Sequence, residues 1–329
     1  MSALPRPAAR FTLARETAAL LEALAAIALW GISFISIKLA LAEVSPVTLI
    51  VVRFALGALV LGGVAWRRGE LARLRAWPQL KRDLPALAGV GLVGITLQQL
   101  LQVSGQATAD ASVAAFLAAT APAFTVALAA LFLRETLRPW QIAGVLVATA
   151  GAALVATNGD WAGLLRGRFG APGNLLVLAS SVVWALLTIL SRKVVQGRPP
   201  TFVTAGMFFF GGLFAAPLFV AQQGWRELAG ISAGGWGAIL FTSLVCTAGA
   251  YLLNTRALQH LSASRVALIQ NVEPAVAVAA AALVLDEAVT LAMLVGGAAI
   301  LGGVYFAERS APVAAPVAQP APQAVPASD

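Results

Sequence analysis

Apolar stretches of about 20 residues follow one another along most of the chain, and they constrain its fold more than any other feature. A helix of that length crosses the hydrocarbon core of a bilayer. Backbone polar groups in lipid must find partners within the protein, so helices are the expected spanning form. Ten spans are predicted, at approximately 19–41, 46–66, 84–105, 109–133, 138–157, 173–192, 201–221, 233–256, 262–285 and 289–307.

Composition excludes most other classes of protein. Of the 329 residues, 60% are hydrophobic and 11% are charged, whereas soluble domains have roughly 45–50% and 25%. The single cysteine, Cys246, rules out an intramolecular disulfide, and the single histidine, His260, leaves no histidine cluster for a metal. We therefore expect no metal site and no cofactor. An enzyme is disfavoured because no group of His, Asp or Glu falls in the middle of the spans.

The distribution of basic residues predicts the orientation. With the N-terminus in the cytoplasm, seventeen of the 22 Lys and Arg fall on the cytoplasmic side, and three (Arg166, Arg168 and Arg226) fall outside. The other two, Lys38 and Arg53, lie within spans. Because basic loops resist translocation, both termini are predicted to be cytoplasmic, in a multi-pass protein of the cell inner membrane. The same excess of basic residues on the cytoplasmic side accounts for the net charge of +8. The expected partner is therefore the lipid bilayer and not nucleic acid.

The two halves of the chain match each other. Ser112, Pro122 and Glu135 recur as Ser264, Pro274 and Glu287, each 152 residues later. Trp30 recurs as Trp184, 154 residues later. Each half has five spans, and because five is odd the second copy enters the membrane from the opposite side. The predicted fold is an all-α integral membrane protein with ten transmembrane helices in two inverted five-helix repeats. Secondary transporters use this architecture, with the substrate site where the repeats meet.

The predicted division of the chain has five parts. They are a cytoplasmic N-terminal segment (1–16), a first repeat (17–158), an external loop (159–172), a second repeat (173–309) and a disordered Ala/Pro-rich cytoplasmic tail (310–329).

The second half contains the segment from Ser262 to Pro274, then Leu285-Asp286-Glu287 and Gly296, and the first half contains Trp30-Gly31, Arg53-Phe54, Pro122 and Arg134-Glu135. With these motifs the chain resembles the drug/metabolite transporter superfamily, and within it the EamA-type ten-helix exporters. It departs at Ala121, where the second half has Glu273. The resemblance implies export of small metabolites or toxic compounds, amino acids among them, from a bacterial cytoplasm.

Glu273 is the one carboxylate, of fourteen, near the middle of a span. An acidic group there is costly and is a functional hypothesis by default. Burial favours its protonated form, which makes Glu273 a candidate proton-coupling site. The alternative is a structural glutamate, either protonated or paired with Arg256 or Arg265.

Two prolines and one arginine are further candidates for coupling or gating. Pro122 and Pro274 stand in mid-span, where we expect kinks that line a central cavity or bend there; the alternative is a static kink. Arg53 lies about 10 Å along its helix. It can reach outward to water, hold a substrate carboxylate or hold a gating acid, and a structural or gating role is favoured.

Amide and aromatic side chains are the candidates for substrate binding. Amides accept from an ammonium group and donate to a carboxylate, and aromatic rings stack on planar or cationic groups. The alternatives are hydrogen bonding between helices and ordinary packing. The candidates are Trp30, Gln98, Gln102, Trp184, Tyr251, Asn254, Gln270 and Asn271.

These features predict a secondary transporter that works by alternating access, with the two five-helix halves rearranging about a central site. The expected substrate is a small organic metabolite, an amino acid first. No ATP-binding motif is present, so a proton gradient or exchange is the expected source of work. The alternative is a ten-span channel or sensor without carrier activity. No pattern sets an interface apart from ordinary helix packing, so the sequence predicts no oligomeric state.

Overall fold

Helices are the only regular elements in the described part of the chain, as the apolar stretches predict. The structure is a computed structural model, and it describes residues 7–70, 80–133, 137–166, 169–195, 199–258, 260–261, 266 and 269–308. In the first half the helices are α1 (Pro7–Leu41), α2 (Pro46–Arg67), α4 (Leu80–Val90), η1 (Gly91–Leu97), α5 (Gln98–Gln106), α6 (Ala111–Ala118), α7 (Ala121–Leu133) and α8 (Pro139–Ala156).

The second half repeats this order after a short connecting helix. Its helices are α9 (Trp161–Leu165), α10 (Pro172–Val195), α11 (Pro200–Ala221), α12 (Trp225–Leu228), α13 (Ala233–Leu240), η2 (Phe241–Gly249), α14 (Ala250–Ala257), α16 (Glu273–Val284) and α17 (Leu291–Glu308). The π-helices η1 and η2 interrupt the third long helix of each half. π-Helical turns are rare and occur often at functional sites.

Seven helices of the described residues are long and apolar enough to cross a membrane. Three shorter apolar helices, within Pro172–Thr188, Glu273–Val284 and Leu291–Ala307, accompany them. Each of these helices overlaps one predicted span. Large apolar side chains stand exposed on their outer faces, among them Leu59 at 73% and Leu283 at 83%. Such faces suit lipid, where exposure of an apolar side chain carries no penalty.

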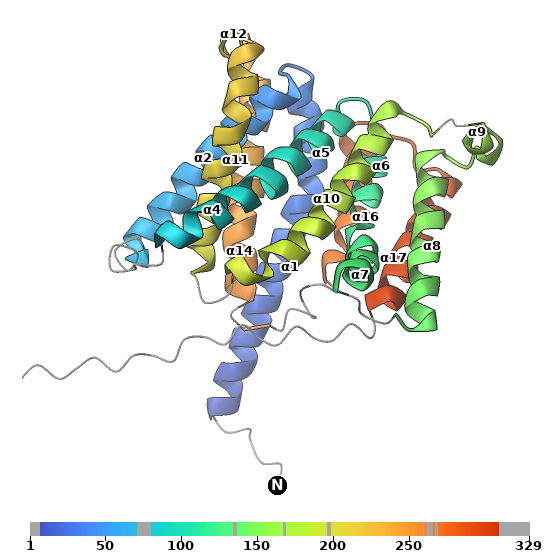
Figure 1. Cartoon of the computed structure of the whole chain (residues 1–329), viewed down its shortest axis with the longest axis horizontal. Coiled ribbons are helices and arrows are strands. Elements are labelled where there is room, and N and C mark those ends of the chain that lie inside the picture. The colour runs from blue at the N-terminus through green and yellow to red at the C-terminus, as the bar shows by residue number, and fades with distance from the viewer. Residues whose placement is uncertain are drawn as a thin grey trace, which may run out of the picture.

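The helices pack into two bundles, and neither bundle is one half of the sequence. The first bundle contains α2, α4–η1–α5, α11 and α13–η2–α14, around a core that includes Phe54, Leu61 and Phe208. The second bundle contains α6, α7, α8, α16 and α17, around a core that includes Phe116, Ala148 and Ile300. Figure 1 shows the two bundles on opposite sides of the molecule. The packing units therefore differ from the two five-helix halves that the sequence repeat defines, because each core draws on both halves.

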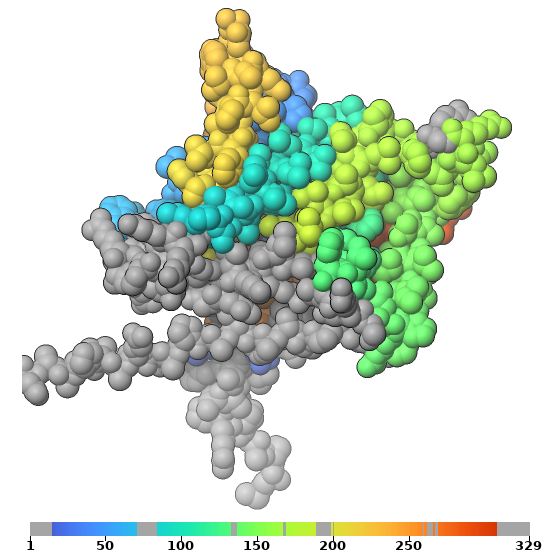
Figure 2. Space-filling model, viewed as in Figure 1, coloured from blue at the N-terminus to red at the C-terminus, as the bar shows by residue number. Residues whose placement is uncertain are grey.

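Helices α1 and α10 lie between the two bundles. Helix α1 packs against α14 in the first bundle and α16 in the second, and α10 packs against α5 and α7 in the same way. These two helices carry Trp30 and Trp184, which occupy equivalent positions in the sequence repeat. In Figure 2, the end that carries α12 projects beyond the neighbouring helices; we call this the α12 end. Helix α1 begins at the opposite end.

The two repeat-related prolines stand at helix starts and not at kinks. Pro122 is the second residue of α7, after a turn at 119–120, and Pro274 is the second residue of α16, after a turn at 271–272. Proline suits this place because the first helical N–H groups need no partner within the helix. The carbonyl of Leu117 accepts hydrogen bonds from the Thr120 and Ser181 hydroxyls, at 2.6 and 3.0 Å. A break with side-chain partners thus replaces the predicted kink.

Glycines bring α8 and α17 into backbone contact. A Cβ atom added at Gly151 would lie 2.6 Å from the Gly296 carbonyl oxygen, and one at Gly303 would lie 2.6 Å from the Gly144 carbonyl oxygen. Gly144 and Gly296 are repeat equivalents, as are Gly151 and Gly303. Exchange of the two halves therefore converts one contact into the other. Close approach through small residues is a common way for helices to associate in lipid.

This contact predicts a large difference between two adjacent glycines. In Gly303→Ala the new methyl group would meet the backbone of α8, so we expect the free energy of unfolding to fall by roughly 1–3 kcal/mol. Gly302 has no atom within 4 Å of an added Cβ, which makes Gly302→Ala the matched control. The measurement is the melting temperature of the detergent-solubilised protein. Equal melting temperatures for the two variants would contradict the close contact.

Candidate functional site

Tyr251 of α14 joins aromatic side chains from three helices. Its ring lies 5.2 Å, between centroids, from that of Trp30 on α1 and 5.2 Å from that of Phe208 on α11, edge to face in both cases. Edge-to-face pairs at such distances are favourable. Trp30 and Tyr251, both candidate binding residues in the sequence, are therefore in contact. Because α1 lies between the bundles, this aromatic group stands at the face that the first bundle presents to α1.

Arg53 of α2 is buried beside this group, with 7% of its surface exposed. Its Nε–H donates to the Thr247 hydroxyl at 2.6 Å, and an Nη1–H donates to the Gln99 side-chain oxygen at 3.2 Å. Both partners are neutral. Arg53 forms no ion pair with a described residue, whereas Arg68 pairs with Glu70 at 3.9 Å. The Arg53 guanidinium is therefore held by dipoles and has no carboxylate partner in the described part of the chain.

Three glutamines of α5 continue from Arg53 as a chain of hydrogen bonds. The Gln99 amide nitrogen donates to the Gln98 oxygen at 2.7 Å, and the Gln98 nitrogen donates to the Gln102 oxygen at 2.6 Å. The chain fixes the Gln99 oxygen toward Arg53. Gln98 and Gln102, two candidate binding residues in the sequence, are thus connected to Arg53 through Gln99. Much of their hydrogen-bonding capacity is already used by one another.

Glu273 faces the same region from the second bundle. It is the first residue of α16, and its backbone approaches α1 so closely that a Cβ atom at Gly31 would lie 2.8 Å from the Glu273 carbonyl oxygen. Tyr251 lies within electrostatic range of both Arg53 and Glu273. Within the described residues the Glu273 carboxylate has no hydrogen bond and no ion pair. The side-chain oxygen of Asn254, one turn from Tyr251, is buried and has no hydrogen-bond partner in the described part of the chain.

Other predicted site residues stand apart from this group. Trp184 packs in a cluster with Leu87, Leu187 and Val203, between α4, α10 and α11. Gln270 is exposed and Asn271 half-buried, just before α16. Pro122 lies at the break between α6 and α7. We call the residues that do gather (Trp30, Arg53, Gln98, Gln99, Gln102, Thr247, Tyr251, Asn254 and Glu273) the central cluster.

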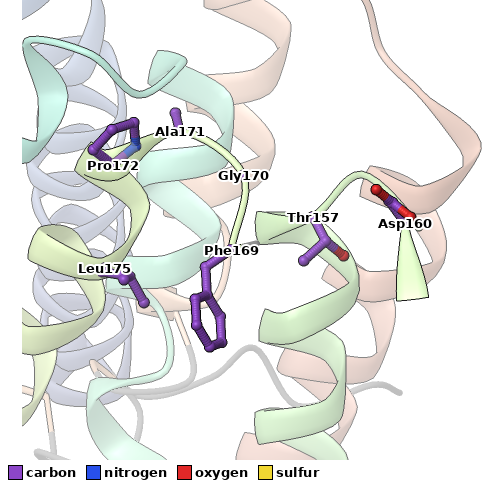
Figure 3. Close-up of a pocket in the computed structure, with 7 residues that line it drawn as sticks. All are labelled: Thr157, Asp160, Phe169, Gly170, Ala171, Pro172 and Leu175. Carbon is purple, nitrogen blue, oxygen red and sulfur yellow. The ribbon is translucent and has the colours of Figure 1, made fainter. Parts of the chain in front are cut away.

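Two surface pockets lie at opposite ends of the molecule, away from the central cluster. One, of about 440 Å³, is formed by the connection between α8 and α10 and the start of α10. Figure 3 shows Phe169 and Leu175 on one side of it and Thr157 and Asp160 on the other. The second, of about 320 Å³, lies at the end where α1 begins, and Arg15, Arg68 and Arg256 line it with Glu22 and His260. Neither contains a predicted site residue.

At the α12 end, carboxylate side chains form hydrogen bonds between the two sequence halves. Glu287 accepts from the backbone N–H groups of Ala111 and Ser112, at 2.7 and 3.0 Å, and from the Ser112 hydroxyl. Glu227 accepts from the Ser45 backbone at 2.8 Å. Each carboxylate thus meets the N-terminus of a helix, where negative charge is favourable.

Two more charged side chains act at the same end. Glu43 accepts from the Ser232 backbone and hydroxyl, at 2.7 and 2.5 Å, at the start of α13. Lys38, which lies within a predicted span, donates to the backbone oxygens of Gln106 and Ala109. These contacts join residues far apart in sequence, so no local pattern indicated them. Likewise, no local pattern indicated that Gln99 and Thr247 accept hydrogen bonds from Arg53.

A comparison with known families settles the class of the protein. The model of the EamA-like transporter family matches residues 17–157 and again 171–308. The chain belongs to the EamA-like transporter family. It is therefore a multi-pass membrane protein of a transporter family, which implies transport and not enzyme catalysis.

Relatives of this family member have matching lengths. An uncharacterized transporter of Archaeoglobus fulgidus is 25% identical, over 85% of this chain and 95% of its own. A probable terminal-alkyne amino-acid exporter of Streptantibioticus cattleyicolor is 29% identical, over 85% and 90%. A probable amino-acid metabolite efflux pump of Salmonella typhimurium is 26% identical, over 86% and 92%. One crystal structure, at 23% identity, shares the fold with a TM-score of 0.59 and covers 88% of this chain and 96% of that one.

The Glu43 contact predicts a pH-dependent stability. Hydrogen bonds from the Ser232 side chain, and then from its backbone, lower the pKa of Glu43 from its usual value of 4.5. A lowered pKa stabilises the fold above the unfolded-state value, and that stabilisation is lost as the pH falls through the folded-state value. The melting temperature of the wild type should therefore exceed that of Glu43→Gln at pH 7, and the gap should close below about pH 4.5.

Ser232→Ala is the control for this prediction. With the hydroxyl donor removed, Glu43→Gln should cost less than it does in the wild type, because the two side chains act as one contact. A gap that stays constant from pH 7 into acid, or that opens in acid, would contradict the contact.

Proposed function

We propose that this chain is a secondary transporter that exports small organic metabolites, amino acids first, across the cytoplasmic membrane by alternating access. The observation that carries the proposal is the central cluster. It gathers a buried cation, a carboxylate, amides and aromatic rings beside α1, in a chain of a transporter family. Polar and ionisable groups within membrane-spanning helices mark substrate or ion pathways.

The chemistry of the central cluster suits an amino acid. Arg53 offers N–H donors to a carboxylate, and Glu273 with the unpartnered Asn254 oxygen offers acceptors to an ammonium group. Tyr251 and Trp30 supply an apolar wall between them. The names of two relatives, an amino-acid exporter and an amino-acid metabolite efflux pump, agree with this substrate class.

The packing supports alternating access around an inverted ten-helix repeat. Helix α2 pairs with its repeat mate α11, and α8 pairs with its repeat mate α17. The pairing of α5 with α10 recurs as that of α14 with α1. Such exchangeable contacts are expected when two inverted copies meet. We propose that the two bundles rock about α1 and α10, with the α12 end external and both termini cytoplasmic.

Glu273 is the proposed proton site. Its carboxylate belongs to the second bundle and interacts electrostatically with Tyr251 of the first bundle. The charge state of Glu273 can therefore favour one arrangement of the two bundles over another. The helix breaks before Pro122 and Pro274 supply places where the second bundle can bend. No other source of work is proposed, and exchange of one substrate for another is the alternative to proton coupling.

Counterflow in proteoliposomes tests the proposal. Liposomes loaded with one unlabelled amino acid should take up the labelled form transiently above equilibrium, and the uptake should saturate. A channel gives no transient accumulation, and a sensor gives no flux. Absence of saturable counterflow across the twenty amino acids would reject the amino-acid assignment.

The same vesicles test coupling through Glu273. Glu273→Gln should remove uptake driven by a pH gradient and leave counterflow, because exchange needs no net proton movement. Glu43→Gln, at the α12 end, is the matched control for loss of a carboxylate. An unchanged response of Glu273→Gln to the pH gradient would exclude Glu273 as the coupling site.

A further inference from the structure

Arg53 is a buried cation whose charge is not neutralised within the described residues. Its neighbours there are a threonine hydroxyl, an amide oxygen and the Phe54 ring, whose centroid lies 5.4 Å from the guanidinium carbon. Burial of a charge without an opposite charge is costly. A buried cation without a permanent opposite charge is expected to bind an anion that is present during only part of the transport cycle.

The hydrogen bonds of Arg53 leave one part of the guanidinium unused. The group has five N–H donors, and the described contacts use one on Nε and one on Nη1. Both acceptors are themselves fixed. The Thr247 hydroxyl donates onward to the Thr242 carbonyl oxygen at 2.8 Å, and Gln99 donates to Gln98. Arg53 is therefore held in one orientation, with its other N–H groups available.

A fixed guanidinium with free N–H groups suits a carboxylate in particular. Arginine binds carboxylates through two parallel charge-assisted hydrogen bonds, and a group already held in place loses little freedom on binding. The alternative of a permanent internal carboxylate is not met by Glu273, whose carboxylate is in no ion pair within the described residues. Arg53 and Glu273 both interact electrostatically with Tyr251.

We propose that Arg53 anchors the carboxylate group of the transported molecule, so that the substrate must carry a carboxylate. The inference rests on the proposed transport function and adds to it the group by which the substrate is selected. Glu273 and Asn254 then face the other end of the transported substrate, which for an amino acid is the ammonium group.

The first test needs only the wild-type protein. Reconstituted protein is offered labelled L-phenylalanine or L-leucine, with the free acid, the carboxamide and L-lactate as competitors. The acid should compete better than its carboxamide by roughly 10- to 100-fold, the value of hydrogen bonds to a charged group. Equal competition by acid and carboxamide would overturn the role of Arg53 while counterflow itself upheld the transport function.

Variants supply the second test. Arg53→Gln should lose the preference for the acid over the carboxamide, and Arg53→Lys, which keeps the charge without the planar pair of donors, should retain part of it. Arg226→Gln on the exposed α12 is the matched loss of a cation and should behave as the wild type. A preference that survives in Arg53→Gln would reject the proposal.

A third readout separates this proposal from the proposed function. Thermal shifts of the detergent-solubilised protein are measured with L-lactate, L-leucine, L-leucinamide and isoamylamine. Stabilisation by carboxylates alone, lost in Arg53→Gln, would support the anchor even if no amino acid were transported. Stabilisation by the amine without a carboxylate would overturn the anchor. If the Arg53 variants fail to fold, the wild-type preference for acid over carboxamide still decides.

Discussion

A polar group inside a bilayer must find its partner within the protein, and most features of this structure follow from that constraint. Turns accompany the helix breaks before Pro122 and Pro274, and at the first break two side-chain hydroxyls donate to the Leu117 carbonyl oxygen. The amides of α5 bond to one another in a chain. At the α12 end, carboxylates meet backbone N–H groups at helix starts. Arg53 differs from these groups because it is a buried charge whose hydrogen-bond partners are both neutral. The proposed substrate carboxylate would supply the opposite charge.

The same constraint explains why the packing units differ from the sequence halves. Lipid supplies no hydrophobic force between helices, so close backbone contact and interhelical hydrogen bonds decide which helices associate. Close backbone contacts join repeat mates, as at Gly151 and Gly296 between α8 and α17. The carboxylates Glu43, Glu227 and Glu287 each bridge the two halves within a single bundle. Each bundle is therefore held together across the halves, and α1 and α10 remain to link one bundle to the other.

The sequence predicted the features that depend on local pattern. Apolar stretches located the helices, and the offsets of 152 and 154 residues identified equivalent positions such as Gly144 and Gly296. Helical spacing was enough to group Gln98 with Gln102. The prolines were expected to kink their helices but stand at helix starts, because the sequence does not show whether a turn or a helix precedes them. The composition of the two bundles was not predicted, because spacing along the chain does not show which of two repeat-equivalent helices packs against a given neighbour.

Partners distant in sequence remained invisible. Trp184 is the repeat mate of Trp30, yet its ring packs in another cluster, so equivalence in sequence did not carry over to the site. Glu287 lies 175 residues from Ser112, and Arg53 lies 194 from Thr247. Family membership fixes the class as a transporter. The sequence left a substrate carboxylate as one of three alternatives for Arg53, and the hydrogen bonds of Arg53 with neutral partners are the reason to propose it.

Distances between spin labels during transport test the central claim, that the bundles and not the sequence halves are the moving units. Ala42 and Gln222 lie in different halves, each next to the first bundle, whereas Gln222 and Ala288 lie in the same half but beside different bundles; all three are exposed. Our account predicts one constant distance for Ala42–Gln222, and for Gln222–Ala288 two populations whose ratio shifts with a transported amino acid. A constant Gln222–Ala288 distance with a shifting Ala42–Gln222 distance would contradict it.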